Sequence, residues 1–524
     1  MKARLTSFVR NTLVLAVIML TSHHPGIAAP TGEIKTAVPE FGYENPVPRL
    51  DGPQANDWML LLYDPLIGIT SEGNLSDARG LATKWEMSRD GLAWTFTLRK
   101  GVKFHDGVEL TAKDVKFSIE QLMLPDSRAT TAGLLRTTIK NIEVKDPYTL
   151  IIQCKKPSIL LDGFLSALEG KDSVVIPKEY FEKVGQDQFV KRPIGSGPYR
   201  WHSQMAGSVI KLEATGEKHW RDGVPKYKYM TFLNVPEEGS LIAMLRTGEA
   251  DIIPVSRQRV KELQKEGFKL ISKKGDAVVC FNPLMQWTSP AFSDIRFRKA
   301  LNLAIDKEAI NSRIFGGMVT PIATYPGPGA PTCGGDPNLP LYPSYNPEEA
   351  KRLLKESGFE GYEFLVPSFK RSSCPEMQDV TEAATGYWQK VGLKPKIVMT
   401  EFASFREKWR TQKVDNTVFG VDSSVAPGCS GLLTRYVQKF SSKDSMTYVK
   451  IPELDQMFDK INKTLDIAEV QQYMGKMYRY IYDQYLLVPI CEINSEYMVS
   501  KKIPEWDMGR GRWYRDYNNF IKER

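Results

Sequence analysis

Residue types that commonly carry out chemistry are sparse in this sequence of 524 residues. After residue 28 it has three histidines, His105, His202 and His219, whose spacing does not suggest a shared metal. It also lacks a His-Glu-x-x-His helix and a Gly-x-Ser-x-Gly nucleophile elbow. A catalytic site made of two paired carboxylates remains an open alternative, because the spacing of residues along a chain does not fix their distance in the fold. The sequence therefore predicts no resident metal, no cofactor and no enzyme.

Six cysteines fit an oxidising compartment, where disulfides form. They are Cys154, Cys280, Cys333, Cys374, Cys429 and Cys491. None forms a Cys-x-x-Cys pair, and the sequence cannot choose among the connectivities that six cysteines allow.

The N-terminus has the three features of a secretory signal. A positive segment contains Lys2, Arg4 and Arg10, an apolar run covers residues 13–20, and a small-x-small site ends at Ala28. The apolar run is too short to span a bilayer. We therefore expect residues 1–28 to be a signal peptide cleaved after Ala28, with an uncleaved anchor as the alternative. No cysteine lies near the site, so no lipid anchor is expected.

Charge and composition describe a globular protein. Hydrophobic residues make up 42% and charged residues 25% of the chain. The formal net charge is +8, and it falls to +5 without the three cations of residues 1–28. This mild excess, without a basic-aromatic motif, does not favour nucleic acid as a partner. The chain is too long for one ordinary core, so we expect two or three domains.

One stretch, residues 78–122, carries the most specific pattern. Trp94, Phe96 and Leu98 alternate with polar residues, which predicts a half-buried strand. Thr111 followed by Asp114 is a capping-box pattern that predicts the start of a helix.

The same stretch resembles the signature region of a known family. It reads Leu-Ala-x-x-Trp, Asp-Gly, Trp-Thr-Phe-x-Leu-Arg-x-Gly-Val-x-Phe-His-Asp-Gly and Leu-Thr-Ala-x-Asp-Val in that order. This pattern resembles the family 5 extracytoplasmic solute-binding proteins of oligopeptide/dipeptide type, which feed ABC importers. Two later segments, Gly195-Ser196-Gly197-Pro198-Tyr199 and Asp294-x-Arg296-x-Arg298-x-Ala300-Leu301, also resemble family segments.

Elsewhere, strand and helix signals alternate, which predicts α/β architecture. Strands are expected at 33–38, 278–282 and 394–399. Asn346 before Pro347 predicts a capped helix start. Two late helices are expected at about 452–465 and 468–485.

The resemblance implies a periplasmic-binding-protein-like fold, with two lobes joined by a hinge plus an extra domain. On this layout the first lobe is discontinuous. The expected divisions are 29–70, 194–277 and 487–524 for lobe I, 71–193 for the extra domain and 278–486 for lobe II.

The resemblance also implies where a ligand is held. Family members hold peptide-type ligands with a carboxylate, an arginine and aromatic walls. Asp422 matches the family aspartate that pairs with a peptide amine, although Phe419 replaces a tryptophan and the spacing to the next proline is one residue longer. Arg371 matches a carboxylate-binding arginine, and Phe402 matches a family aromatic. Phe419, in the place of the family tryptophan, is a further candidate for contact with the ligand.

Weaker candidates lie near the N-terminus. Asp51 and Pro53 occupy a loop where relatives contact their ligand. Tyr43 and Trp287 are aromatic loop residues that could also contribute. For Asp422 and Arg371 the alternatives are a solvated loop acid and a surface arginine. For Phe402 the alternative is a core aromatic.

The expected function is capture of a peptide or amino-acid-derived solute in the periplasm and its delivery to an inner-membrane ABC permease. The chain is expected to act as a monomer. One alternative keeps the fold but changes the ligand to an opine, an oligosaccharide or a metal chelate. The other alternative is a secreted hydrolase.

Overall fold

The computed structural model describes residues 29–284, 289–325, 333–336, 339–341, 345–371, 374–424, 428–444, 447–503, 505–509 and 517. The predicted signal peptide and Trp287 lie outside the described residues. No helix in these ranges is long and apolar enough to cross a membrane.

An eight-stranded mixed sheet runs through the molecule in the order β15-β12-β16-β11-β1-β10-β9-β8. Strand β1 is parallel to β10 and β11, and the other neighbours are antiparallel. The strands are β1 (Glu33–Val38), β8 (Tyr199–Met205), β9 (Val209–Ala214), β10 (Tyr229–Asn234), β11 (Ile252–Pro254), β12 (Lys269–Pro283), β15 (Val418–Ser424) and β16 (Val488–Val499).

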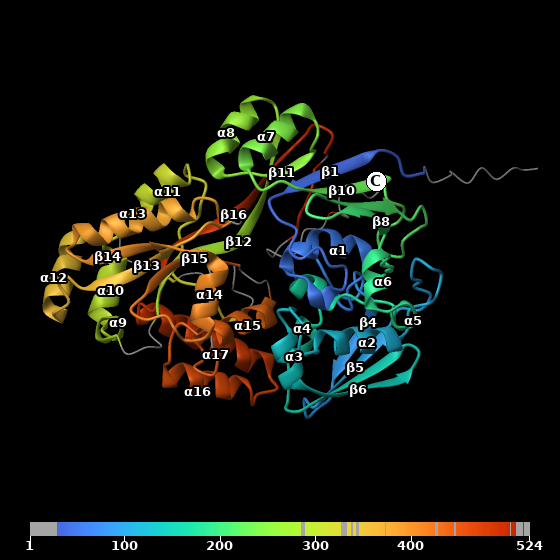
Figure 1. Cartoon of the computed structure of the whole chain (residues 1–524). Helices are drawn as coiled ribbons and strands as arrows, with labels where there is room; N and C mark the ends of the chain where they lie inside the picture. Colours follow the sequence, from blue (N-terminus) through green and yellow to red (C-terminus); the bar gives the residue numbers. More distant parts are fainter. Residues whose placement is uncertain are drawn as a thin grey trace, which may run out of the picture.

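Strands β12 and β16 connect the two lobes of the molecule (Figure 1). The N-terminal end of β12 pairs with the C-terminal end of β16 beside β11. Further along, residues 277–281 of β12 pair with 488–493 of β16 beside β15. The register shifts between Lys273 and Ala277, where Gly275 has a φ of 66°. One continuous pair of strands therefore belongs to both lobes.

The predicted strand at 278–282 is too short, because β12 already begins at Lys269. The irregularity around Gly275 interrupts the alternation of apolar and polar residues that marks a strand. The predicted boundaries between the domains stay predictions.

Lobe I contains β1, β8–β11 and three helices. Its helix α1 is buried along its length, and Trp58, Met59 and Leu62 pack into the apolar core. Helix α7 packs beside β11, and α8 packs against β12 and β16 (Figure 1). The helices are α1 (Asn56–Leu62), α7 (Glu238–Thr247) and α8 (Arg257–Lys265).

The extra domain is built on a four-stranded antiparallel sheet in the order β4-β5-β7-β6. The predicted strand is present as β5, with Trp94, Phe96 and Leu98 buried. The predicted capping box is confirmed, since Thr111 and Asp114 cap α2 reciprocally. The elements are β4 (Ala82–Met87), β5 (Ala93–Leu98), α2 (Ala112–Leu122), α3 (Ala132–Thr138), β6 (Ile139–Asp146) and β7 (Thr149–Cys154).

Short elements connect lobe I with the extra domain. They are η1 (Pro48–Leu50), η2 (Pro53–Ala55), β2 (Gly68–Ile69), β3 (Leu75–Ser76), α4 (Leu161–Phe164), η3 (Ala167–Ser173), α5 (Lys178–Val184) and α6 (Gln186–Lys191).

Lobe II contains β13 (Glu363–Ser368) and β14 (Lys394–Met399), which are parallel, together with β15. The predicted cap at Asn346 is confirmed, because its side chain accepts the backbone N–H of Glu349. The helices are α9 (Pro290–Ser293), α10 (Ile295–Leu303), α11 (Lys307–Ile314), α12 (Pro347–Ser357), α13 (Met377–Lys390), α14 (Phe402–Arg410), α15 (Gly428–Phe440), α16 (Pro452–Ile461) and α17 (Ile467–Asp483).

A disulfide joins Cys333 to Cys429, at the start of α15. The sequence left the connectivity open, and this is the pair that forms among the six cysteines. Cys154, Cys280, Cys374 and Cys491 are buried free thiols.

A buried ion pair ties lobe I to lobe II. The guanidinium of Arg257, the first residue of α8, lies 3.1 Å from the carboxylate of Glu376, which precedes α13. Both side chains are almost fully buried. Arg257 also donates to the backbone carbonyl of Asn494 in β16. The pair therefore sits beside the strands that connect the lobes.

A second buried cluster surrounds Asp64 between α1 and β2. His219 Nε2 lies 3.1 Å from Asp64 Oδ2, and His219 Nδ1 lies 3.3 Å from Asp222 Oδ2. Arg221 bridges the same two carboxylates. Burial alone lowers the pKa of His219, but the two carboxylates outweigh it and raise this pKa to about 8.

We expect the loss of one member of the Arg257–Glu376 pair to destabilise the protein. Either Arg257→Met or Glu376→Gln leaves a buried partner uncompensated, which costs about 3–5 kcal/mol. Urea unfolding followed by circular dichroism measures the loss. The control is Arg259→Met, because this half-exposed arginine on the same helix pairs with Glu262 near the surface, where a pair contributes about 1 kcal/mol or less. Equal losses for Arg257→Met and the control would contradict the expectation.

Protonation of His219 should make stability depend on pH. Its pKa in the fold, about 8, is higher than its ordinary value of 6.5, so the charged form stabilises the fold at low pH. This contribution is complete below about pH 6.5 and is lost as the pH rises through 8. The unfolding free energy of wild type minus that of His219→Gln should therefore fall by about 2 kcal/mol from pH 6 to pH 9. His202→Gln, at an exposed histidine, controls for the loss of an imidazole side chain. A difference that is flat with pH would refute the assignment.

Candidate functional site

The site is built at the carboxyl ends of three parallel strands. β13 and β14 are parallel, and a parallel bridge between Leu365 and Thr417 joins β13 to the chain entering β15. Arg371 follows β13, Phe402 follows β14, and Asp422 lies near the end of β15. Residues at the carboxyl ends of neighbouring parallel strands meet at one edge of a sheet, the usual position of a ligand site in α/β folds.

Arg371 and Asp422 form an ion pair. The Nε of Arg371 donates to Oδ1 of Asp422 at 2.7 Å. The Asp422 side chain is fully buried, whereas the Arg371 side chain is 18% exposed. The arginine therefore extends from a buried carboxylate toward the surface of the site.

Phe402 holds the flat face of the same guanidinium. Cζ of Arg371 lies 4.2 Å from the centroid of the Phe402 ring, which is a cation–π contact. Phe402 is half-buried and packs against Phe369 with ring centroids 4.9 Å apart. Among the described residues, Arg371 hydrogen-bonds only to Asp422, and it does so through Nε. Its two terminal NH₂ groups form the fork that binds a carboxylate with two hydrogen bonds.

The structure thus brings together three of the residues that the sequence selected: Arg371, Phe402 and Asp422. The sequence assigned Arg371 and Asp422 to opposite ends of a ligand, whereas here they contact each other. Asp422 fixes the position of the arginine.

Phe419 lies away from this cluster. Residues 419 and 422 point to opposite faces of β15, because side chains alternate along a strand. Phe419 is fully buried, with its ring centroid 5.1 Å from that of Phe405, 5.0 Å from that of Trp409 and 5.7 Å from that of Tyr448. It therefore belongs to the apolar core under the site.

Asp51 organises its own loop. Its buried carboxylate accepts backbone N–H groups of Tyr43, Asn45 and Gly52 at 2.9, 2.7 and 2.6 Å. Burial raises its pKa, against the opposing effect of these hydrogen bonds. Pro53 starts the short helix η2. Tyr43 is exposed and stacks on Arg128.

Lys439 is a residue near the site that sequence reasoning missed. It projects from α15 and donates to the hydroxyl of Ser423, the neighbour of Asp422, at 2.9 Å. The helix carries two basic side chains, Arg435 and Lys439, and nothing in the sequence pattern distinguishes the lysine. Only the packing of α15 against β15 identifies it.

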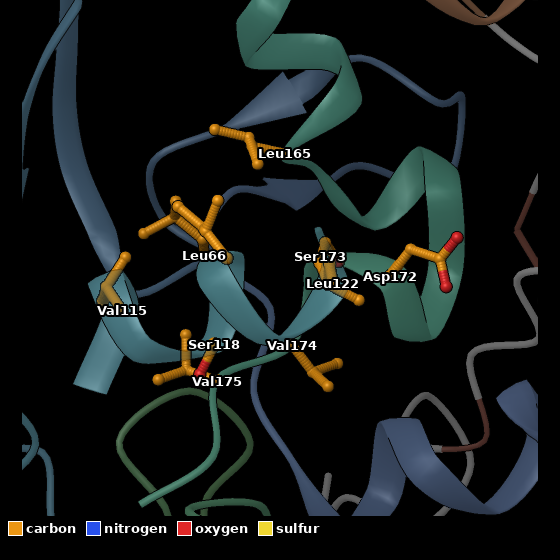
Figure 2. A pocket seen from close by; sticks show the side chains of 10 residues that line it. Leu66, Val115, Ser118, Leu122, Leu165, Asp172, Ser173, Val174 and Val175 are labelled. Carbon is orange, nitrogen blue, oxygen red and sulfur yellow. The ribbon is translucent and has the colours of Figure 1, made fainter. Parts of the chain in front are cut away.

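Within the described ranges, no cluster of three or more His, Cys, Asp or Glu side chains could hold a metal ion. One small pocket lies between α2 and the segment 172–175 (Figure 2). Its lining is mostly apolar, including Leu66, Val115 and Leu122, and its volume of about 10 Å³ has room for about one water molecule. It is too small for a solute.

Comparisons with known proteins agree with this architecture. The family model for bacterial extracellular solute-binding proteins, family 5 (middle), matches residues 78–442. Heme-binding protein A of Haemophilus influenzae is 30% identical over 414 residues, covering 74% of this chain and 73% of that protein. The glutathione-binding protein GsiB of Salmonella choleraesuis is 29% identical over 338 residues, covering 64% of this chain and 63% of that protein, which is less than two thirds of its length.

A solved structure extends the likeness to nearly the whole chain. The periplasmic binding protein DppA of Helicobacter pylori, in complex with the peptide STSA, superposes with a TM-score of 0.76. The alignment covers 94% of this chain and 98% of that chain at 20% sequence identity, which establishes the shared fold. The predicted two-lobed fold with an extra domain is confirmed. The chain belongs to the bacterial extracellular solute-binding proteins of family 5, the solute-capturing components of ABC importers.

Proposed function

We propose that this protein captures a peptide or amino-acid-derived solute in the periplasm, between its two lobes, and delivers it to an inner-membrane ABC permease. Arg371 binds a carboxylate of the solute through its terminal NH₂ groups. Phe402 provides an aromatic wall, and Asp422 holds the arginine in place while adding a negative charge beside it that favours a solute ammonium group.

The single observation that carries this proposal is the geometry of Arg371. Its Nε is fixed by a buried carboxylate and its face by an aromatic ring, so little freedom is lost when the NH₂ fork binds a ligand. An arginine restrained in this way at the carboxyl ends of parallel strands is suited to carboxylate recognition.

The relatives support a carboxylate-bearing solute. Glutathione and a peptide, named for two of them, each carry an amine and a carboxylate. Heme, named for another, is a metal chelate whose two propionates are also carboxylates. A metal chelate therefore remains the second candidate for the solute, and Arg371 would serve it equally well.

We expect loss of either member of the ion pair to weaken solute binding. Arg371→Met removes the carboxylate partner, and Asp422→Asn removes the charge that positions it. Each should cost about 2–5 kcal/mol of binding free energy, because a buried charged group loses its partner. Isothermal titration calorimetry with the identified solute measures the change. The control is Arg406→Met, at an exposed arginine of α14. Unchanged affinity in both site variants would reject this role.

The solute itself can be identified by native mass spectrometry of freshly purified protein. We expect an added mass that corresponds to a carboxylate-bearing small molecule, because closed lobes retain their solute. Incubating the protein with that molecule should return it chemically unchanged. A time-dependent product would instead support the secreted hydrolase, and a bound neutral sugar would support the oligosaccharide alternative.

A further inference from the structure

Lys439 occupies an unusual position on the other face of β15. Its Nζ donates to Ser423 Oγ at 2.9 Å and to the hydroxyl of Tyr448 at 2.6 Å. The same ammonium group lies 4.9 Å from the ring centroid of Tyr325 and 4.7 Å from that of Tyr448. Two hydroxyls and two aromatic faces therefore hold the amine in one place.

This amine has no carboxylate partner among the residues that the structure describes. Its charge is surrounded by protein, yet the side chain keeps part of its surface accessible. A cation in such a position is costly unless an anion compensates it. Cation–π contacts and neutral hydroxyls compensate it only in part.

Arg371 and Lys439 flank the same strand end. Asp422 and Ser423 are consecutive, so their side chains leave β15 on opposite faces. Asp422 holds Arg371 on one face, and Ser423 contacts Lys439 on the other. A solute lying across the end of β15 would meet one cation on each side.

The charges around these two cations differ. Arg371 already has the carboxylate of Asp422 as a counter-charge, whereas Lys439 has none at ion-pair distance. Arg435, one turn earlier on α15, adds positive charge near the amine. Two basic side chains, Lys439 and Arg435, therefore lie on this side of β15, and Arg435 also interacts with the buried carboxyl group of Glu169.

We propose that Lys439 binds a second acidic group of the solute, so that the solute class is amino-acid-derived molecules with at least two carboxylates. This inference rests on the proposed function, because it assigns one carboxylate to Arg371. It narrows that function from any peptide-like solute to an acidic one.

Proton binding gives the proposal an independent readout. Burial and the nearby charge of Arg435 together lower the pKa of Lys439 to about 7, against the opposing effects of Cys280 and Asp422. The other titratable groups that face the amine are the hydroxyls of Tyr325 and Tyr448. A carboxylate placed beside the amine favours its charged form. At pH 8, binding of an acidic solute should therefore be accompanied by uptake of a proton.

The experiment compares the dipeptides Ala-Glu and Ala-Gln, which have nearly the same size but differ by one carboxylate. Calorimetry at pH 7 is run on wild type, on Lys439→Met, and on Lys450→Met as a control at an exposed lysine. Wild type and the control should bind Ala-Glu at least tenfold more tightly than Ala-Gln. In Lys439→Met the two affinities should agree within about twofold. Lys439→Gln provides the same test if the methionine variant does not fold.

Calorimetric titrations of Ala-Glu at pH 8, in two buffers with different ionisation enthalpies, report whether a proton is taken up on binding. The observed enthalpy should depend on the buffer for wild type and should not for Lys439→Met. Equal binding of the two dipeptides by wild type, or a preference for Ala-Glu that survives in Lys439→Met, would overturn the proposal and leave the proposed function standing. Failure of wild type to bind either dipeptide would count against both.

Discussion

The pairing of β12 with β16 is the constraint on which the rest of the structure depends. These two strands run from lobe I into lobe II within one sheet, so the lobes share backbone hydrogen bonds as well as chain connections. The pairing is irregular around Gly275, where a bulge interrupts the ladder. Bulges bend and twist a strand pair locally. A bend at this point would reorient one lobe relative to the other, which is the kind of hinge motion that closes two lobes around a ligand.

The site follows from the strand order on the lobe II side. Because β15 pairs with β12, its carboxyl end is held next to the hinge strands, and the ends of β13 and β14 lie beside it. Close packing under the strand is visible at Gly420, where a Cβ would lie 2.5 Å from a ring carbon of Phe281. Glycine here lets β15 approach the core, and two residues later Asp422 emerges on the same face to hold Arg371.

Local signals in the sequence predicted local structure well. Three predicted features depend only on neighbours in sequence, and all three are present. They are the strand with alternating apolar residues at 94–98, the capping box at Thr111 and the helix cap at Asn346. The predicted strand at 278–282 covers only part of β12, since the bulge breaks the period on which strand prediction relies. The resemblance selected Arg371 and Asp422 separately, but their contact joins residues 51 positions apart. Lys439 could not be found at all, because its role depends on how α15 packs.

Several buried charged groups in this protein lie where separate segments of the chain meet. Some of the cations have a carboxylate partner in the protein, whereas Lys439 contacts only neutral groups. The clusters around Asp64 and the pair of Arg257 with Glu376 join distant segments, and in both a carboxylate lies within hydrogen-bonding distance of the cation. Such pairs add little net stability compared with apolar packing, but they penalise any arrangement that separates them. Lys439 is held only by neutral groups in the part of the chain that the structure describes. Lys439 therefore differs from Arg371, which already has the carboxylate of Asp422, and the acidic solute that we propose would supply the counter-charge.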